Sequence, residues 1–107
     1  MKETRLEDLN LSTFTPLVNS SFFARQDTGE LIHLILVEAK PLSIGGKEGG
    51  PNAGSFSLIF HGPDRCFLSQ KLHTFEHEKI GTFSLFIVPV GKAPGIIQYQ
   101  AVFNRAA

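Results

Sequence analysis

Two histidines are the residues whose spacing most resembles a reactive site. His73 and His77 lie four positions apart, with Glu76 and Glu78 beside the second. On a helix this spacing would form a zinc-binding pair. On a strand about 13 Å of chain separates the imidazoles, at roughly 3.3 Å per residue, and zinc needs each nitrogen at about 2.1 Å. Because the segment reads as a strand, we expect no metal here. His77 is instead expected to pack at a strand end and bond to backbone.

The single cysteine, Cys66, is a second candidate for chemistry. With Asp64 and one of the histidines it would supply a nucleophile, a base and an orienting group. The spacing fits no family signature, and a cysteine followed by two large apolar residues is typical of a core position. Ser57 and Ser69 lack the surroundings of a nucleophile elbow. We therefore predict no catalytic residues and no enzyme.

A glycine-rich loop at about residues 45–54 invites comparison with a phosphate cradle. It has no Gly-Lys-Ser/Thr step and no helix after it, and Glu48 places a negative charge where a phosphate would sit. A flexible loop is the expected structure. No cofactor is predicted.

Charge is balanced along the chain. The chain has ten lysines and arginines and ten aspartates and glutamates, which gives a net charge of zero. The basic residues form no block, and nucleic-acid binding draws most of its affinity from a concentrated positive face. We therefore predict no nucleic-acid partner. Zero net charge also removes one barrier to contact between copies.

The compartment follows from what the sequence does not contain. Residues 1–9 are too polar for a signal-peptide core, and the longest strongly apolar run, Leu34–Val37, is too short to cross a bilayer. Cys66 has no second cysteine to pair with. We expect a cytoplasmic protein without a membrane partner, folded as one domain over residues 1–107.

The elements that position these residues are predicted to be strands. Short apolar runs with period-two alternation are separated by Gly, Pro and Asp turns. Only residues 4–18 read as helical, with Thr4 and Glu7 as a capping box or with a second start at Ser12. The predicted strands are Ser21–Arg25, Leu31–Lys40, Ser55–His61, Leu72–Glu76, Thr82–Val90 and Ile96–Phe103. The expected fold is all-β: a small antiparallel β-barrel or two-layer sandwich of about six strands with a short N-terminal helix.

Two of these strands are apolar on both faces, at residues 31–37 and 83–90. A strand of a small sheet turns only one face to the core, so the second face needs a cover. We expect a protein partner, self or another chain, near Leu34, Leu36, Phe86 and Val88.

Five stretches carry a resemblance to a known family. They are Phe14–Phe22, Phe56–Pro63, Glu76–Gly81, Leu85–Gly91 and Tyr99–Asn104. In these stretches the chain resembles an uncharacterised family of small bacterial proteins known only as a domain of unknown function. Members are associated with phage-tail-collar-like proteins, so the resemblance implies a structural or assembly role. Family members tend to have Gly at the position of Asn19, a difference that concerns a turn.

These observations predict a non-enzymatic structural or protein-interaction module that self-associates. The family resemblance implies that the module belongs to a phage-tail-like assembly. One alternative function is the binding of a small apolar ligand inside a β-barrel, because an interior lined by many of the ten Phe side chains would suit such a ligand. A second is a metal- or cysteine-dependent enzyme. A well-packed barrel interior would remove the ligand alternative.

Overall fold

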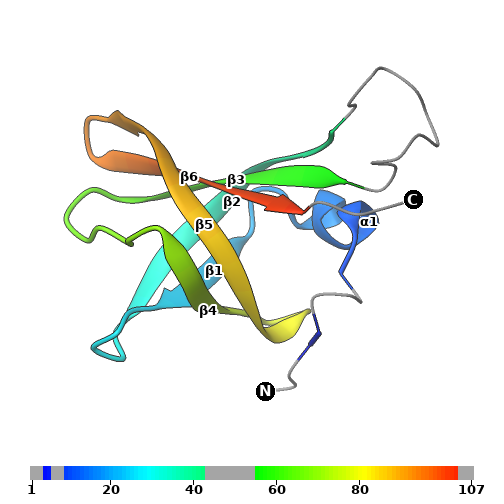
Figure 1. The fold of residues 1–107 in the computed structure, drawn as a ribbon, viewed down its shortest axis with the longest axis horizontal. Coiled ribbons are helices and arrows are strands. Elements are labelled where there is room, and N and C mark those ends of the chain that lie inside the picture. Colours follow the sequence, from blue (N-terminus) through cyan, green and yellow to red (C-terminus); the bar gives the residue numbers. More distant parts are fainter. Residues whose placement is uncertain (1–3, 6–8, 43–54, 104–107) are drawn as a thin grey trace.

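The computed structural model is a closed barrel of six antiparallel strands (Figure 1). It describes residues 4–5, 9–42 and 55–103. The predicted all-β antiparallel fold is confirmed, and of the two predicted architectures it is the barrel. The strands are β1 (Ser21–Arg25), β2 (Leu31–Pro41), β3 (Phe56–Pro63), β4 (Lys71–His77), β5 (Gly81–Ala93) and β6 (Ile96–Phe103).

The strands run around the barrel in the order β1, β2, β3, β6, β5, β4, and pairing of β1 with β4 closes it. Two irregularities help the long strands to bend. The register shifts between Leu36 and Glu38 in β2, and between Pro89 and Gly91 in β5. An extra residue in one strand increases its twist and bends it. β5 therefore pairs with β4 over its first half and with β6 over its second.

The N-terminal helix is shorter than predicted. α1 (Leu11–Phe14) is followed by the 3-10 segment η2 (Thr15–Leu17). Asn10 caps α1, since its side-chain oxygen accepts from the Thr13 N–H at 3.1 Å and its own N–H donates to the Thr13 hydroxyl at 3.2 Å. None of the helices in the described ranges has the length and apolar character needed to cross a bilayer.

The predicted helix start at Thr4 is wrong. The backbone N–H of Thr4 donates to the carbonyl of Thr82 at 2.6 Å, and its hydroxyl donates to the carbonyl of Ile80 at 2.5 Å. Thr4 therefore lies against the β4–β5 turn. Glu7, the other member of the predicted capping box, lies outside the described residues.

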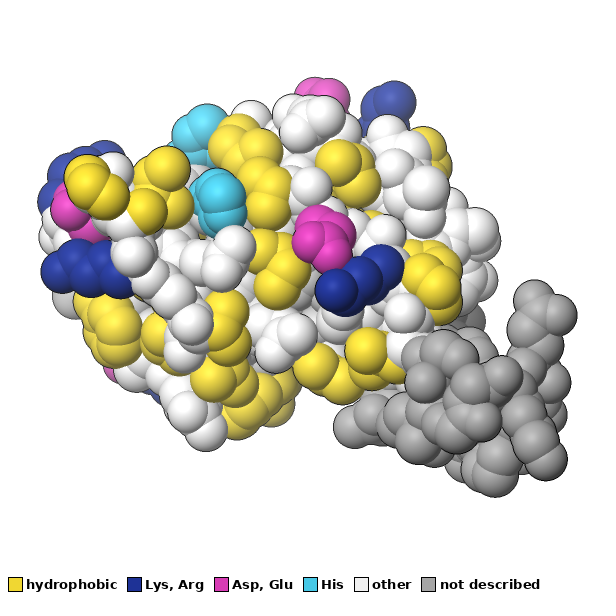
Figure 2. All heavy atoms as spheres, turned by 90° about the horizontal axis from the view of Figure 1, so that it is seen from above, with side chains coloured by type: hydrophobic (Ala, Val, Ile, Leu, Met, Phe, Trp, Pro, Cys, Tyr) yellow, Lys and Arg dark blue, Asp and Glu magenta, His cyan; other side chains and the backbone are white. Residues whose placement is uncertain are grey.

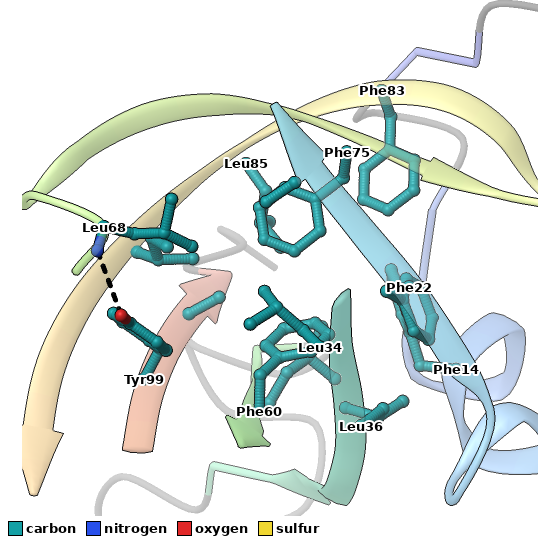
Figure 3. Close-up of a cluster of buried hydrophobic side chains, with 14 of the residues drawn as sticks. Phe14, Phe22, Leu34, Leu36, Phe60, Leu68, Phe75, Phe83, Leu85 and Tyr99 are labelled. Atoms are coloured by element: carbon teal, nitrogen blue, oxygen red, sulfur yellow. Dashed lines mark hydrogen bonds between the residues drawn. The ribbon is translucent and has the colours of Figure 1, made fainter. Parts of the chain in front are cut away.

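Aromatic rings fill one end of the barrel. Phe14, from the short helix, contacts the rings of Phe22, Phe56, Phe83 and Phe103 at centroid distances of 5.8–6.3 Å. These spacings are typical of packed aromatic pairs. The α1–η2 segment thus closes this end, and Figure 3 shows Phe14 beside Phe22 in the barrel interior.

The β3–β4 loop, residues 64–70, covers the other end. Leu68 from this loop is buried, and the Tyr99 hydroxyl accepts a hydrogen bond from its backbone N–H at 3.0 Å (Figure 3). Between the two ends the inward side chains of the six strands form one continuous core. A barrel of this strand count is narrow enough for side chains to fill it. The filled interior argues against the apolar-ligand alternative.

Candidate interaction surfaces and binding pocket

His73 and His77 lie on β4 and both are buried on its inner side. The strand that the sequence predicts here is confirmed, so the two imidazoles are separated along an extended chain. His73 Nε2 lies 2.8 Å from the carbonyl oxygen of Ser69. Over the part of the chain that the structure describes, there is no group of three or more His, Cys, Asp or Glu residues placed to hold a metal ion.

His77 links the end of β4 to the turn before β1. The backbone N–H of Lys79 donates to Nδ1 at 3.0 Å, so the ring proton is on Nε2, which lies 3.0 Å from the Ser20 hydroxyl. Ser20 in turn donates to the carbonyl of Leu17 at 2.5 Å. Burial lowers the pKa of His77 from its ordinary value. The predicted backbone hydrogen bond of His77 is confirmed.

Cys66 is half-buried against the core and its thiol lies 3.5 Å from the Arg65 guanidinium. Asp64 points elsewhere: its carboxylate accepts from the backbone N–H of Gly95 at 3.2 Å. Asp64 thus ties the β3–β4 loop to the β5–β6 turn, which is a structural role. The glycine-rich loop at residues 45–54 lies outside the described residues.

Leu34 and Leu36 are core residues, with no exposed surface. Placing them on a partner-binding face was wrong because alternation in β2 turns them inward. The outer face of β2 carries His33, Ile35 and Val37. Of the two predicted positions on β5, Phe86 is 48% exposed and Val88 is half-buried on the same outer side.

One apolar patch lies over β2 and β3, and we call it the β2–β3 face. His33, Ile35 and Val37 from β2 meet His61 and Pro63 from β3, and Ile96 of β6 borders them. A depression of about 390 Å³ lies over these residues. Figure 2 shows histidine side chains among hydrophobic ones on the face it presents. The surface is therefore hollowed and mainly apolar.

The two histidines of this face are held by neighbours on adjacent strands. His33 Nε2 lies 2.7 Å from the Ser21 hydroxyl, and its ring stacks on Phe23 at 5.3 Å. His61 Nε2 lies 3.2 Å from the side-chain nitrogen of Gln98. These contacts fix the rings at the rim of the depression.

A second apolar patch is a cross-strand pair, Leu72 and Phe86, which we call the β4–β5 pair. The two residues are direct partners in the register and are 59% and 48% exposed. Both side chains project outward, since their neighbours His73, Leu85 and Ile87 are buried. In the strand order, the β4–β5 junction lies opposite the β2–β3 junction. The barrel thus carries a projecting apolar patch on one side and a hollowed one on the other.

A third feature is a pocket of about 210 Å³ between the β1–β2 and β3–β4 loops, which we call the loop pocket. Asp27, Phe67, Ser69, Lys71 and His73 line it together with Gln26, Thr28 and Leu68. Asp27 and Lys71 form an ion pair within it. That contact, mainly through a charge-assisted hydrogen bond, holds the pKa of Asp27 below its ordinary value.

The loop pocket could not be found from the sequence. Asp27 and Lys71 are 44 positions apart, the first on the β1–β2 loop and the second at the start of β4. No spacing rule joins them, because only the pairing of β1 with β4 brings the two residues together. Finding the pocket from the sequence would have required knowing that β1 pairs with β4. Alternation along the strands does not give that pairing, because it does not specify strand order.

The fold defines this protein as a small closed antiparallel β-barrel. The chain belongs to the family described as a domain of unknown function, DUF6916, which it matches over residues 9–103. No curated protein matches the chain, and no solved structure does. The family's description names no activity, source or assembly, so the link to phage-tail-collar-like proteins stays a prediction.

Proposed function

We propose that this protein is a non-enzymatic structural module whose copies associate head to tail through the outer surface of the barrel. The observation that carries the proposal is the opposite placement of the β4–β5 pair and the hollowed β2–β3 face. Single exposed apolar residues are ordinary on protein surfaces, whereas contiguous apolar patches and grooves are typical of interaction sites.

The placement also favours one type of assembly. A twofold dimer uses the same patch on both copies, whereas a head-to-tail contact joins two different patches. Leu72 and Phe86 project, and the β2–β3 face is concave, so one is suited to enter the other. A contact of this type leaves each end copy with a free patch, and therefore builds rings or filaments.

Electrostatics permits the contact. The chain carries no net charge, so copies experience little long-range repulsion. The ion pair of Glu38 with Lys40, at 3.2 Å on the outer side of β2, adds no net charge there. A phage-tail-like assembly is one setting in which repeated head-to-tail contacts are needed.

The test uses two complementary variants. Phe86→Glu places a charge on the projecting patch, and Ile35→Glu places one on the hollowed face. Each variant alone is expected to be monomeric in sedimentation-velocity ultracentrifugation, because each has lost one side of the contact. A mixture of the two keeps one intact contact, so an equimolar mixture is expected to form dimers.

Val102→Glu is the matched control. Val102 is an exposed apolar residue of β6 that belongs to neither patch, and its replacement is expected to leave the assembly of the parent unchanged. A mixture that stays monomeric, while the parent associates, would contradict head-to-tail contact. Retained association of the Ile35→Glu variant alone would indicate a twofold dimer through β4 and β5.

A further inference from the structure

We propose that the loop pocket binds a guanidinium group, carried either by a small free compound or by an arginine side chain of another protein. This proposal does not depend on self-association, since the pocket residues belong to neither patch. It rests on the acceptors, the charge, the aromatic wall and the size of the pocket.

The first acceptor is His73. Its side chain is 5% exposed, and Nε2 lies 2.8 Å from the Ser69 carbonyl, which can only accept, so Nε2 carries the ring proton. Nδ1 therefore keeps its lone pair, and within the described residues it has no hydrogen-bond partner. His73 is one of the residues that line the pocket, and a neutral imidazole with an unused acceptor favours a ligand that donates N–H groups.

The second acceptor is the Asp27 carboxylate, which is already bound by a cation. Lys71 occupies it through one ammonium group, and the pair is exposed. An exposed ion pair is weak in water, so an incoming cation with better geometry can take its place. Guanidinium has five donors in a planar fork and is matched to a carboxylate in a way that ammonium is not.

Phe67 supplies the third element. It is 61% exposed, the most exposed of the large hydrophobic residues in the described ranges, and it lines the pocket. An aromatic face attracts cations, and a planar guanidinium also stacks on it. The two acceptors and the ring together suit one planar cation that donates to Asp27 and His73.

The size of the pocket limits the ligand. Sites for drug-sized molecules usually exceed about 300 Å³, and this pocket measures about 210 Å³. It therefore suits a single side chain or a small cation. A larger ligand would have to leave most of its surface in water.

The experiment titrates isotope-labelled full-length protein with methylguanidinium, followed by amide chemical shifts of Gln26, Leu68 and Ser69 in the millimolar range. Saturable shifts at these amides are expected. Asp27→Asn is expected to weaken binding and Lys71→Gln to strengthen it, because Lys71 competes for the same carboxylate. Each substitution is expected to change the dissociation constant about threefold to fivefold, which corresponds to the free energy of an exposed ion pair.

Glu38→Gln and Lys40→Gln are the matched controls, since they remove the members of another exposed ion pair, and neither is expected to change the affinity. Equal affinity for methylguanidinium and for N-acetyl-arginine methylamide would assign the site to small guanidinium compounds, and tighter binding of the second would assign it to a partner's arginine. Absence of saturable shifts would overturn the proposal. Stronger binding by Asp27→Asn together with weaker binding by Lys71→Gln would also overturn it, because that pattern is expected of an anion site.

Discussion

The Tyr99 hydroxyl accepts a hydrogen bond from the backbone N–H of Leu68 at 3.0 Å and thereby fixes the β3–β4 loop over one end of the barrel. The same hydroxyl lies 3.5 Å from the carbonyl oxygen of Cys66. Burial raises the pKa of the Tyr99 phenol, so the group stays protonated and neutral. One side chain of β6 thus holds a loop that separates the core from water.

Replacement of Tyr99 by Phe is expected to lower the free energy of unfolding by about 1–3 kcal/mol, because the buried N–H of Leu68 loses its acceptor. Urea denaturation measures the loss. Hydrogen exchange at the Leu68 amide is expected to become faster, while exchange at the Phe14 amide near the other end stays as in the parent. Equal stability of the two proteins would show that the hydroxyl does not hold the loop.

Acidification is expected to destabilise the protein through His77. Its pKa is lower in the folded state than the ordinary value of 6.5, so the unfolded chain binds the proton more tightly. The contribution of neutral His77 is full above about pH 6.5 and is lost as the pH falls from there toward its folded pKa. Protonation of Nδ1 also breaks the hydrogen bond from the Lys79 N–H, because Nδ1 then carries a proton and no longer accepts.

Thermal unfolding of the parent and of His77→Asn between pH 7.5 and 5 tests this, since an asparagine oxygen still accepts from a backbone N–H. The variant is expected to be less stable at pH 7.5 and less sensitive to acid. His33→Asn, at an exposed imidazole, serves as the control. A parallel pH dependence of parent and His77→Asn would assign the acid effect to other groups.

Gly62 is expected to tolerate no side chain. It lies on the inner side of β3, where an added Cβ would come within 2.4 Å of Leu34 Cδ2 and 3.3 Å of the Tyr99 ring. Overpacking of a filled core costs about 1–3 kcal/mol, and Gly62→Ala is expected to fall in that range by urea denaturation.

A double-mutant cycle with Leu34→Ala separates the clash from other effects. Leu34→Ala opens space beside Gly62, so the cost of Gly62→Ala is expected to be smaller in that background. Additive losses in the double variant would show that Leu34 is not the obstacle.

Asn19 is expected to accept glycine and reject β-branched residues. Its φ is 75°, in the left-handed region that favours Gly and tolerates Asn. Asn19→Gly is expected to retain stability to within about 0.5 kcal/mol, and Asn19→Val to lose about 1–2 kcal/mol. Chemical denaturation of both variants checks the order. A Val variant as stable as the Gly variant would contradict the strained turn.

Much of the fold was predictable because alternation along each strand encodes which side faces the core. Phe56, Leu58 and Phe60 share one side of β3 in the sequence and are all buried in the structure. Closure was not predictable, because the β1–β4 pairing joins residues such as Phe23 and Glu76 whose types do not specify one another. The same gap explains the wrong helix start at Thr4, whose partner Thr82 lies in a distant strand.

The surface was predictable only in part. Two apolar faces on residues 31–37 signalled that one would need a cover, but the sequence did not say which face lies inward. Both Phe86 and Leu34 were expected on a face that a partner covers. Phe86 is exposed in the structure, whereas Leu34 is buried in the core. Where both faces of a strand are apolar, alternation does not tell them apart, and the inward face becomes known only with the strand order.

The most direct test of head-to-tail association is light scattering coupled to size exclusion over a concentration series of the unmodified protein. One copy has a mass of 11.8 kDa. The mean mass is expected to rise with concentration beyond that of a dimer, because each added copy presents a free patch. A mass of 11.8 kDa at every concentration would contradict self-association, and a plateau at twice that value would contradict the head-to-tail arrangement.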